Sequence, residues 1–438
     1  MPPSPSESAL SHKHQRIAAW LPWLTWGLGA LLFCYAFFHR LAPSVMIDSL
    51  MRDLAVGGAL LGNLSAFYFY AYASIQIPVG LTIDRWGPRR VLSISAAFCA
   101  LGSIVFAGAE SLTTAYLGRL MIGAGAAFAF VGSLKLATNW FPPRRFAQLT
   151  GLTMMAGMIG GIAAQAPLAA LVEITGWRAA LTGAAVAGGI IAAAIWIIVR
   201  DRPPTAAEQP PDAAALGGET VSVLQGLVRV LRTPQNWLIA LTSAVMTAPM
   251  LSFAGLWGVA WLMQTRGFER PEAAATTSLL LIGWAVGSPI TGWLSDRLGR
   301  RKPILQASML LGLLALLAIL YLPDLPVPVL WALFAGSGMC FGAMAVGFAM
   351  ARTANATEVT GAAYGFVNMA VTATGAIFQP LIGWLLDLRW SGEMLDGARV
   401  YSAETYGFAL ASLPIFMTLG LLATLFLHSD SKAETHRK

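Results

Sequence analysis

Long apolar segments recur along almost the whole chain, and each is about long enough to cross a lipid bilayer. A membrane-spanning helix takes about 20 mainly apolar residues, and twelve segments meet that requirement. They are residues 20–47, 56–82, 89–109, 111–137, 147–172, 178–199, 236–263, 273–294, 303–322, 328–350, 361–387 and 404–427. The pattern therefore predicts an all-α membrane protein with twelve transmembrane helices.

A polar stretch after the sixth apolar segment divides the twelve segments into two groups of six. It reads RDRPPTAAEQPPDAAALGGET from residue 200, and this Pro- and Gly-rich composition is typical of a linker. The segment VSVLQGLVRVLR that follows is amphipathic, as surface-bound membrane helices are. We predict an N-terminal tail (1–19), a six-helix bundle (20–199), a linker (200–235), a second six-helix bundle (236–427) and a C-terminal tail (428–438).

The charged residues predict how the chain is oriented in the membrane. The 438 residues are 57% hydrophobic and only 11% charged, with a formal net charge of +7. Of the 28 Lys and Arg, 19 lie in the tails and in the loops on their side, whereas six lie in the opposite loops. By the positive-inside rule, both termini face the cytoplasm. The basic charge thus reflects topology, and we expect no nucleic-acid partner.

Features of other protein classes are missing from the sequence. The N-terminal tail lacks the apolar core of a cleaved signal peptide. Cys34, Cys99 and Cys340 lie inside predicted helices and show no metal-type spacing, so we expect neither disulfides nor a metal. Neither a nucleotide-binding loop nor a catalytic triad stands out. We therefore expect no cofactor, no enzymatic activity and no direct use of ATP.

Two loops at equivalent places in the two halves carry the same motif. GLTIDRWGPRRVL (80–92) follows the second predicted helix, and GWLSDRLGRRKPIL (292–305) follows the eighth, at an offset of 212. Helices five and eleven match at an offset of 214, through Gly151, Met155, Gly161 and Gln165 against Gly365, Met369, Gly375 and Gln379. Duplication of a six-helix unit is typical of transporters, whose substrate site lies near the membrane midplane between the repeats.

These loops resemble the G-x-x-x-D-R-x-G-R-R motif of the major facilitator superfamily, and the resemblance covers essentially the whole chain. It implies two pseudo-symmetric six-helix bundles, with the loops bracing the cytoplasmic helix ends during gating. The first copy departs from the motif at Pro88. The gating candidates are Asp84, Arg85, Arg89, Asp296, Arg297 and Arg301. We expect Asp84 to meet a helix N-terminus and the Arg residues to hold carbonyls or acids; a role in topology alone leaves the repeated Asp and Gly unexplained.

Three basic residues, Arg40, Arg119 and Lys135, lie within predicted helices, where no Asp or Glu lies at comparable depth. Charges there cost about 2.5–3.5 kcal/mol on insertion scales, so they are rare and usually functional. Fixed positive charge without a carboxylate favours an anion, or the carboxylate end of a zwitterion. Arg119 either bonds across helices or takes part in coupling. Lys135 either extends to the cytoplasmic face or has a functional role.

The segment CYAFFHRLAPSVM (34–46) resembles the anion:cation symporter branch of the superfamily. In that branch an N-Y-x-D-R-x-x-L-S-V type segment supplies an Arg that binds an organic acid, which implies that Arg40 anchors the substrate. His39 stands where those carriers have Asp, and Ala126 lies about where they have a proton-binding Glu. His39 is therefore either a protonatable substitute or a neutral histidine bonded to a backbone carbonyl.

Polar and aromatic residues on three more helices complete the candidate site. They are Tyr68, Tyr72, Gln76, Trp257, Asn368 and Gln379. The first three share one face of helix two, where lining a wet cavity competes with an interfacial aromatic belt. The two residues of helix eleven either line the cavity or tie helices together. The tryptophan of helix seven forms an apolar wall for the ligand or packs against lipid.

Together these features predict a secondary carrier in the bacterial inner membrane, working as a monomer by rocker-switch alternating access. The substrate would be a small organic anion or carboxylate-bearing zwitterion, such as a sugar acid, monocarboxylate, amino acid or short peptide. Proton coupling is the default in the symporter branch, and uniport or exchange stays open. The chain is also similar to nutrient carriers of intracellular bacterial pathogens. Alternatives are an efflux carrier for amphipathic metabolites or drugs and a membrane sensor that has lost transport.

Overall fold

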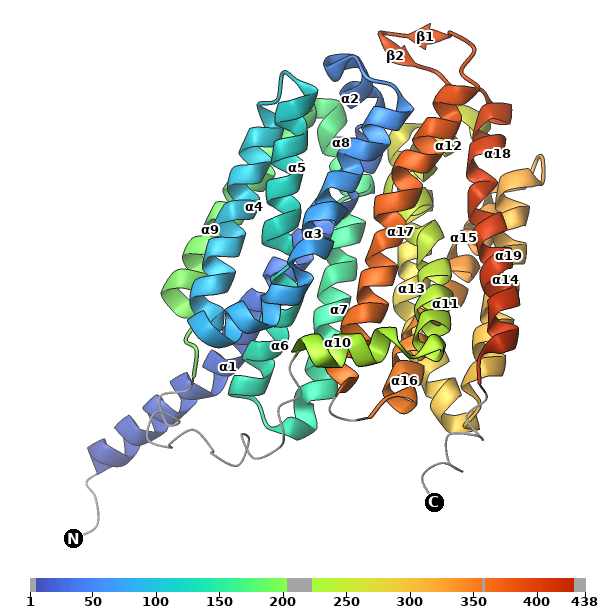
Figure 1. Cartoon of the computed structure of the whole chain (residues 1–438). Helices are drawn as coiled ribbons and strands as arrows, with labels where there is room; N and C mark the ends of the chain where they lie inside the picture. The colour runs from blue at the N-terminus through green and yellow to red at the C-terminus, as the bar shows by residue number, and fades with distance from the viewer. Residues whose placement is uncertain (1–4, 203–222, 357–358, 429–438) are drawn as a thin grey trace.

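The computed structural model describes residues 5–202, 223–356 and 359–428. Two bundles of long helices stand side by side, and the first and last described helices begin and end at the same end of the molecule (Figure 1). We call this the terminus end. The opposite end carries a short β-hairpin, and we call it the hairpin end.

The first half contains the elements from α1 to α9. They are α1 (Pro5–Leu41), the 3₁₀-helix η1 (Ala42–Val45), α2 (Ile47–Leu54), α3 (Gly58–Trp86), α4 (Pro88–Ala107), α5 (Leu112–Ala126), α6 (Ala129–Trp140), η2 (Pro143–Arg145), α7 (Phe146–Ala163), α8 (Ala166–Thr175) and α9 (Trp177–Ile198). The amphipathic part of the linker forms α10 (Val223–Leu231), which lies across the terminus end in Figure 1.

The second half repeats this plan from α11 onward. Its elements are α11 (Pro234–Ala248), the π-helix η5 (Pro249–Trp257), α12 (Gly258–Arg266), α13 (Arg270–Leu298), α14 (Arg301–Tyr321), α15 (Val327–Phe341), α16 (Met344–Ala354), α17 (Thr360–Leu388), β1 (Met394–Leu395), β2 (Ala398–Arg399), α18 (Ala403–Leu410), α19 (Ser412–Ala423) and η7 (Thr424–Phe426).

The predicted all-α membrane fold is confirmed. Eleven spans of the described chain are long and apolar enough to cross a bilayer, and the number is twelve when α2 and α3, bent by 110°, count as one. Several spans are composed of two helices, as α5 and α6 are. The sequence pattern, which measures only apolar length, does not show these breaks.

Local chemistry explains some of the interruptions. Helix α1 ends just after Arg40 and gives way to η1, which contains Pro43; proline has no backbone N–H to continue the helical ladder. Pro249 begins the π-helical stretch of the seventh span in the same way. The hairpin turns at Asp396 and Gly397, both with positive φ, a dipeptide typical of two-residue hairpins.

The two halves make their closest contact at the hairpin end. Helix α3 packs against α17 so closely that a methyl group added to Gly383 would overlap the carbonyl oxygen of Gly58. The phenol of Tyr70 also reaches across to the carbonyl of Ala376, at 3.3 Å. Small residues allow this approach because no side chain separates the two backbones.

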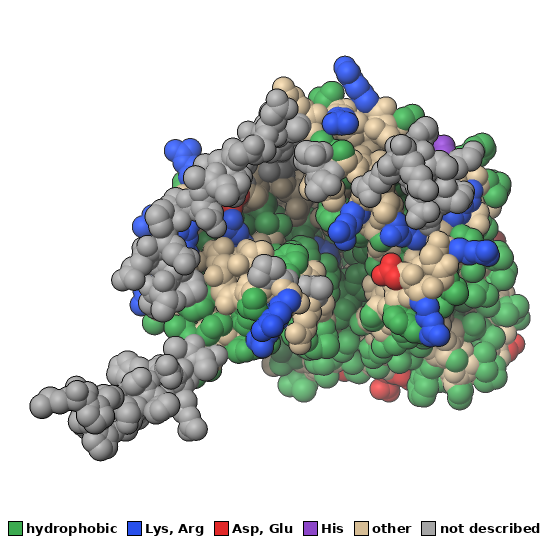
Figure 2. Space-filling view, turned by 90° about the horizontal axis from the view of Figure 1, so that it is seen from below, with side chains coloured by type: hydrophobic (Ala, Val, Ile, Leu, Met, Phe, Trp, Pro, Cys, Tyr) green, Lys and Arg blue, Asp and Glu red, His purple; other side chains and the backbone are tan. Residues whose placement is uncertain are grey.

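At the terminus end the molecule is hollowed between the halves. Figure 2 looks onto this face and shows a depression with hydrophobic side chains on its walls and Lys and Arg around it. The hairpin end is closed and the terminus end is open, so a solute could enter the space between the halves from the terminus end.

We expect Gly383→Ala to weaken the contact between α3 and α17. Overpacking a tight interface costs about 1–3 kcal/mol, so the melting temperature of the purified protein should fall. Gly365→Ala is the matched control, because a Cβ at Gly365, on the same helix, would meet nothing within 4 Å. Equal melting temperatures for both variants would contradict the proposed tight contact.

Candidate substrate site

Arg40 lies in the last turn of α1, in a largely aromatic environment. Its guanidinium carbon lies 4.3 Å from the ring centroid of Phe37, 4.9 Å from that of Tyr72 and 5.5 Å from that of Tyr68. No Asp or Glu of the described chain forms an ion pair with it, and its Nε–H has no hydrogen-bond partner there. Cation–π contacts partly stabilise the charge, but its donors are not fully used.

Arg119 is fixed more firmly than Arg40. From α5 it donates to the carbonyl oxygens of His39 (2.7 Å) and Ser65 (3.1 Å), and so ties α1 and α3 to the fourth span. Only 1% of Arg119 is exposed, against 8% of Arg40. Of the two neighbouring arginines, Arg40 therefore keeps more access to solvent. Arg119 makes the cross-helix bond that was one of its two predicted roles.

His39 points away from solvent and is 1% exposed. Its ring packs edge-on against Tyr35, with 4.5 Å between centroids, and against Phe38, at 5.4 Å. The Nε2 atom has no hydrogen-bond partner within the described chain. An unpaired buried nitrogen is costly, and the described chain supplies no group that compensates it.

The polar face of α3 lies beside Arg40. The Tyr68 hydroxyl donates to the carbonyl of Ala36 at 3.1 Å, which fixes its ring against α1. Tyr72 stacks on Tyr68 with 6.0 Å between ring centroids. Gln76, one turn further along, is partly buried and its Nε2 has no partner within the described residues. Arg40, Tyr68 and Tyr72 are thus brought together, with Gln76 on the same helix face toward the terminus end.

The candidates of the second half do not join this group as one cluster. Trp257 donates from Nε1 to the carbonyl of Gln379 at 3.0 Å, and Gln379 donates from Nε2 to the carbonyl of Leu251 at 2.8 Å. Both side chains are fully buried, so here they pack η5 against α17. Asn368 is only partly buried and makes no hydrogen bond within the described chain, so its amide is free for a ligand.

At the terminus end, the gating candidates of the first half pair within that half. Asp84 forms an ion pair with Lys135 at 2.6 Å, so Lys135 does extend to this end of its helix. The N-terminus of α4 is instead capped by Asp201, whose Oδ1 accepts from the Arg89 backbone N–H at 2.8 Å. The expected contact of Asp84 with a helix N-terminus is therefore wrong for α4, because Asp201 occupies that place. The Arg89 side chain holds the Trp196 carbonyl, as expected for the Arg residues.

The equivalent loop of the second half is more open. Arg301 donates to the Thr353 hydroxyl at 2.7 Å, and Arg297 lies over the ring of Trp293. Asp296 and Arg85 are exposed. None of these contacts crosses between the halves, as is expected when the terminus end is open.

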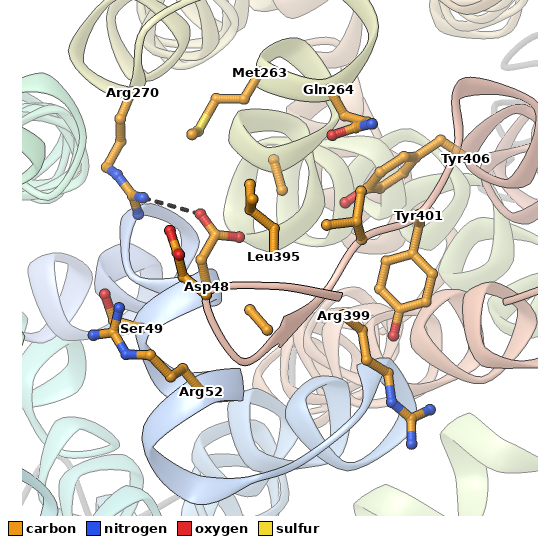
Figure 3. A pocket seen from close by; sticks show the side chains of 14 residues that line it. Asp48, Ser49, Arg52, Met263, Gln264, Arg270, Leu395, Arg399, Tyr401 and Tyr406 are labelled. Carbon is orange, nitrogen blue, oxygen red and sulfur yellow. Dashed lines mark hydrogen bonds and ion pairs between the residues drawn. The ribbon is translucent and has the colours of Figure 1, made fainter. Parts of the chain in front are cut away.

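Charged residues at the hairpin end form contacts between the halves that the sequence pattern does not predict. Arg270 of the second half donates to Asp48 and to the Val45 carbonyl of the first, both at 2.9 Å. Figure 3 shows this pair beside a cavity of about 280 Å³ that Arg399 and Tyr401 also line. These residues lie near helix ends, where charged residues are common. Their sequence positions therefore give no sign of a function, and only their contacts in the structure show that they join the halves.

Sequence comparison now identifies the family. The model of the Major Facilitator Superfamily matches residues 28–380 and 241–437. The chain belongs to this superfamily and is a multi-pass membrane transporter of that fold, as its two loop motifs predicted.

Curated relatives include carriers of organic anions. The chain is 25% identical to a probable sulfoacetate transporter, SauU, of Cupriavidus necator over 63% of this chain and 65% of that protein. It is 22% identical to a probable galactarate/D-glucarate transporter, GudP, of Escherichia coli, over 85% and 88%. It is also 24% identical to the membrane sensor protein UhpC of Salmonella typhimurium, over 97% and 93%.

Solved structures confirm the fold. A bacterial homolog of the human lysosomal transporter Spinster, in an inward-facing and unoccupied conformation, superposes with a TM-score of 0.75 at 16% identity, over 93% of this chain and 97% of that one. A single-residue mutant of the nucleoside transporter NupG gives a TM-score of 0.74 at 15% identity, over 93% and 99%.

Arg119→Leu should destabilise the protein more than Arg40→Ala does. The substitution removes two buried hydrogen bonds from a charged group, and hydrogen bonds of this type contribute about 1.5–3 kcal/mol each. We expect a lower melting temperature and a lower yield of monodisperse protein in detergent. A larger fall in melting temperature for Arg40→Ala than for Arg119→Leu would contradict the structural role of Arg119.

The Tyr401 hydroxyl predicts a dependence of stability on alkaline pH. Burial raises the pKa of Tyr401, and its hydrogen bond to Asp387 and the charge of that carboxylate raise it further. A raised pKa means that the contribution of Tyr401 is complete below about pH 10, the usual tyrosine pKa, and is lost as the pH rises above it. The difference in melting temperature between the wild type and Tyr401→Phe should therefore shrink from about pH 9 to about pH 11. A constant difference would contradict this assignment.

Proposed function

We propose that the protein is a secondary transporter of a small organic anion or a carboxylate-bearing zwitterion, with Arg40 as the anchor for the carboxylate. The observation that carries the proposal is a buried guanidinium with no acidic partner in the described chain and an unused Nε–H donor. An anionic ligand supplies the missing charge and accepts from the free donor.

The surroundings of Arg40 suit such a ligand. The rings of Tyr68 and Tyr72 lie beside the guanidinium and would orient a carboxylate against it. Gln76 and Asn368 have amide groups without hydrogen-bond partners in the described chain and would bind the polar remainder of the substrate. Trp257 and Gln379 are assigned to closing the hairpin end, because both are packed within it.

The names of the relatives support this substrate class. Sulfoacetate and glucarate each carry two acidic groups, and two carriers with those names align with this chain. The particular acid is not defined by their 22–25% identity. Small dianions and sugar acids are therefore the first substrates to test.

Transport would proceed by alternating access. With the termini in the cytoplasm, this conformation is open to the cytoplasm, and the hairpin end faces outward. Substrate binding must favour the change of state, since a ligand with equal affinity for every state shifts nothing. His39 is the candidate for proton coupling, because it is the titratable neighbour of Arg40 and its Nε2 is unpaired within the described residues.

A sensor is the second candidate, because the relative named a membrane sensor aligns over 97% of this chain. A sensor would bind the same ligand at Arg40 without moving it across the membrane. Binding and transport therefore have to be measured separately.

We expect Arg40→Ala to abolish uptake while the protein stays folded. Sulfoacetate, D-glucarate and L-galactonate should be screened by thermal shift, since a ligand at 100 times its Kd adds about 2.7 kcal/mol of stability. The acid that raises the melting temperature of the wild type should not change the melting temperature of Arg40→Ala. Uptake of that acid into proteoliposomes should be lost in the variant.

Arg266→Ala is the control variant, because Arg266 lies at the hairpin end and, among the residues that the structure describes, bonds only the Leu322 carbonyl. Uptake by Arg40→Ala at the wild-type rate would contradict the assignment of Arg40 as the anchor for the carboxylate. Stabilisation by an acid without any uptake by the wild type would favour the sensor. Stabilisation only by lipophilic cations or neutral drugs would favour efflux.

A further inference from the structure

The internal duplication places two carboxylates at equivalent positions of the hairpin end. The offset of 214 that relates helices five and eleven also relates Glu173, near the end of α8, to Asp387, near the end of α17. The offset of 212 between the second and eighth spans relates Gly58, the first residue of α3, to Arg270, the first residue of α13. Each carboxylate faces the equivalent helix start in the opposite half.

In one copy the carboxylate binds the helix start directly. Asp387 accepts hydrogen bonds from the backbone N–H groups of Gly58 (2.9 Å) and Ala59 (2.8 Å), the first amides of α3. It also accepts from the Tyr401 hydroxyl (2.6 Å) and pairs with Arg399 (3.0 Å). The first amides of a helix lack partners within it and carry partial positive charge, so an anion there is stabilising.

In the other copy a side chain replaces the amides. Glu173 lies 3.9 Å from the Nε of Arg270, which is longer than a hydrogen bond. The same guanidinium donates to Asp48 and the Val45 carbonyl, both at 2.9 Å. Thus Arg270 reaches from the second half to the first, and Glu173 contributes little to holding the Arg270 side chain in place.

Glycine explains why the two copies differ. A Cβ at Gly58 would lie 2.8 Å from the Gly383 carbonyl oxygen, and one at Gly57 would lie 2.8 Å from Asp387. Only glycines at these places let the carboxylate reach the amides. The residues equivalent to Gly58 and Gly383 are Arg270 and Ala169. The contact between α8 and α13 therefore has a long, flexible side chain where the contact between α3 and α17 has close backbone approach.

We propose that Asp387 is the principal lock of the hairpin end and that Glu173, its duplicate, is a weak one. Opening this end separates Asp387 from the Gly58 and Ala59 amides and also breaks the 2.8 Å hydrogen bond from the Gly58 N–H to the Tyr401 hydroxyl. Tyr401 and Arg399 belong to the same half as Asp387 and stay with it. The amides are part of the helix and cannot follow the carboxylate. Arg270, in contrast, can extend as Glu173 moves. The lock goes beyond the proposed substrate site and does not depend on which solute is carried.

The test measures the distance across the hairpin end in the full-length protein. Spin labels on Thr113→Cys and Ala403→Cys, one exposed site in each half, report it by double electron–electron resonance, after Cys34, Cys99 and Cys340 are changed to Ala. Asp387→Asn should raise the ratio of long-distance to short-distance populations by about tenfold or more, which corresponds to about 1.4 kcal/mol. Glu173→Gln should change it by less than about threefold.

Glu393→Gln is the matched control, an exposed acid in the loop after α17 whose side chain makes no hydrogen bond or ion pair in the described chain. Tyr401→Phe removes the hydrogen bond to Asp387 and the one that the hydroxyl accepts from the Gly58 N–H at 2.8 Å. It leaves both bonds from the amides to Asp387, so it should raise the ratio less than Asp387→Asn does. Tyr401→Phe replaces Asp387→Asn in the test if the latter does not fold. Unchanged distances in Asp387→Asn, or in Tyr401→Phe if it is needed, would overturn the proposal. So would an effect of Glu173→Gln as large as that of Asp387→Asn. No substrate is added, so the result is independent of the uptake test on Arg40.

Discussion

Positive charge within the membrane-spanning helices is the constraint around which the first half is arranged. Three basic side chains lie within the predicted spans, and each is stabilised differently. Arg119 is held by two backbone carbonyls, and Lys135 reaches Asp84 at the terminus end. Arg40 lies against aromatic side chains, and its Nε–H has no partner within the described chain. The charge left without an acidic partner is therefore that of Arg40, which an anionic solute can complete.

The sequence was sufficient to predict the fold and the family. Apolar length predicted the spans, and the repeated loop motif predicted the superfamily. Apolar length can be recognised in a single sequence because the thickness of the bilayer imposes it on every spanning helix. The grouping of Arg40, Tyr68 and Tyr72 was also predictable, since helical spacing places the tyrosines on one face and the charge within a span marks the arginine.

Contacts between distant segments could not be predicted in this way. Asp201 looked like part of a linker, yet it caps α4 where Asp84 was expected to meet a helix start. Asp387 looked like an ordinary charge at a helix end, although it joins the two halves. Trp257 and Gln379 had the residue types and spacing of cavity walls and are instead packed together. Polarity and periodicity give the helix face of a residue but not the partner opposite it.

The hairpin between α17 and α18 has a practical consequence for labelling the protein. Exposed loop tips usually tolerate tags and insertions, and this one is short, exposed and far from the terminus end (Figure 1). Its turn, however, rests on the first half: a Cβ at Gly397 would lie 3.2 Å from the side chain of Arg52. Arg399 and Tyr401, just beyond the turn, hold Asp387. An epitope or fluorescent protein inserted there would act as a wedge between the halves, so fusions belong at the chain ends.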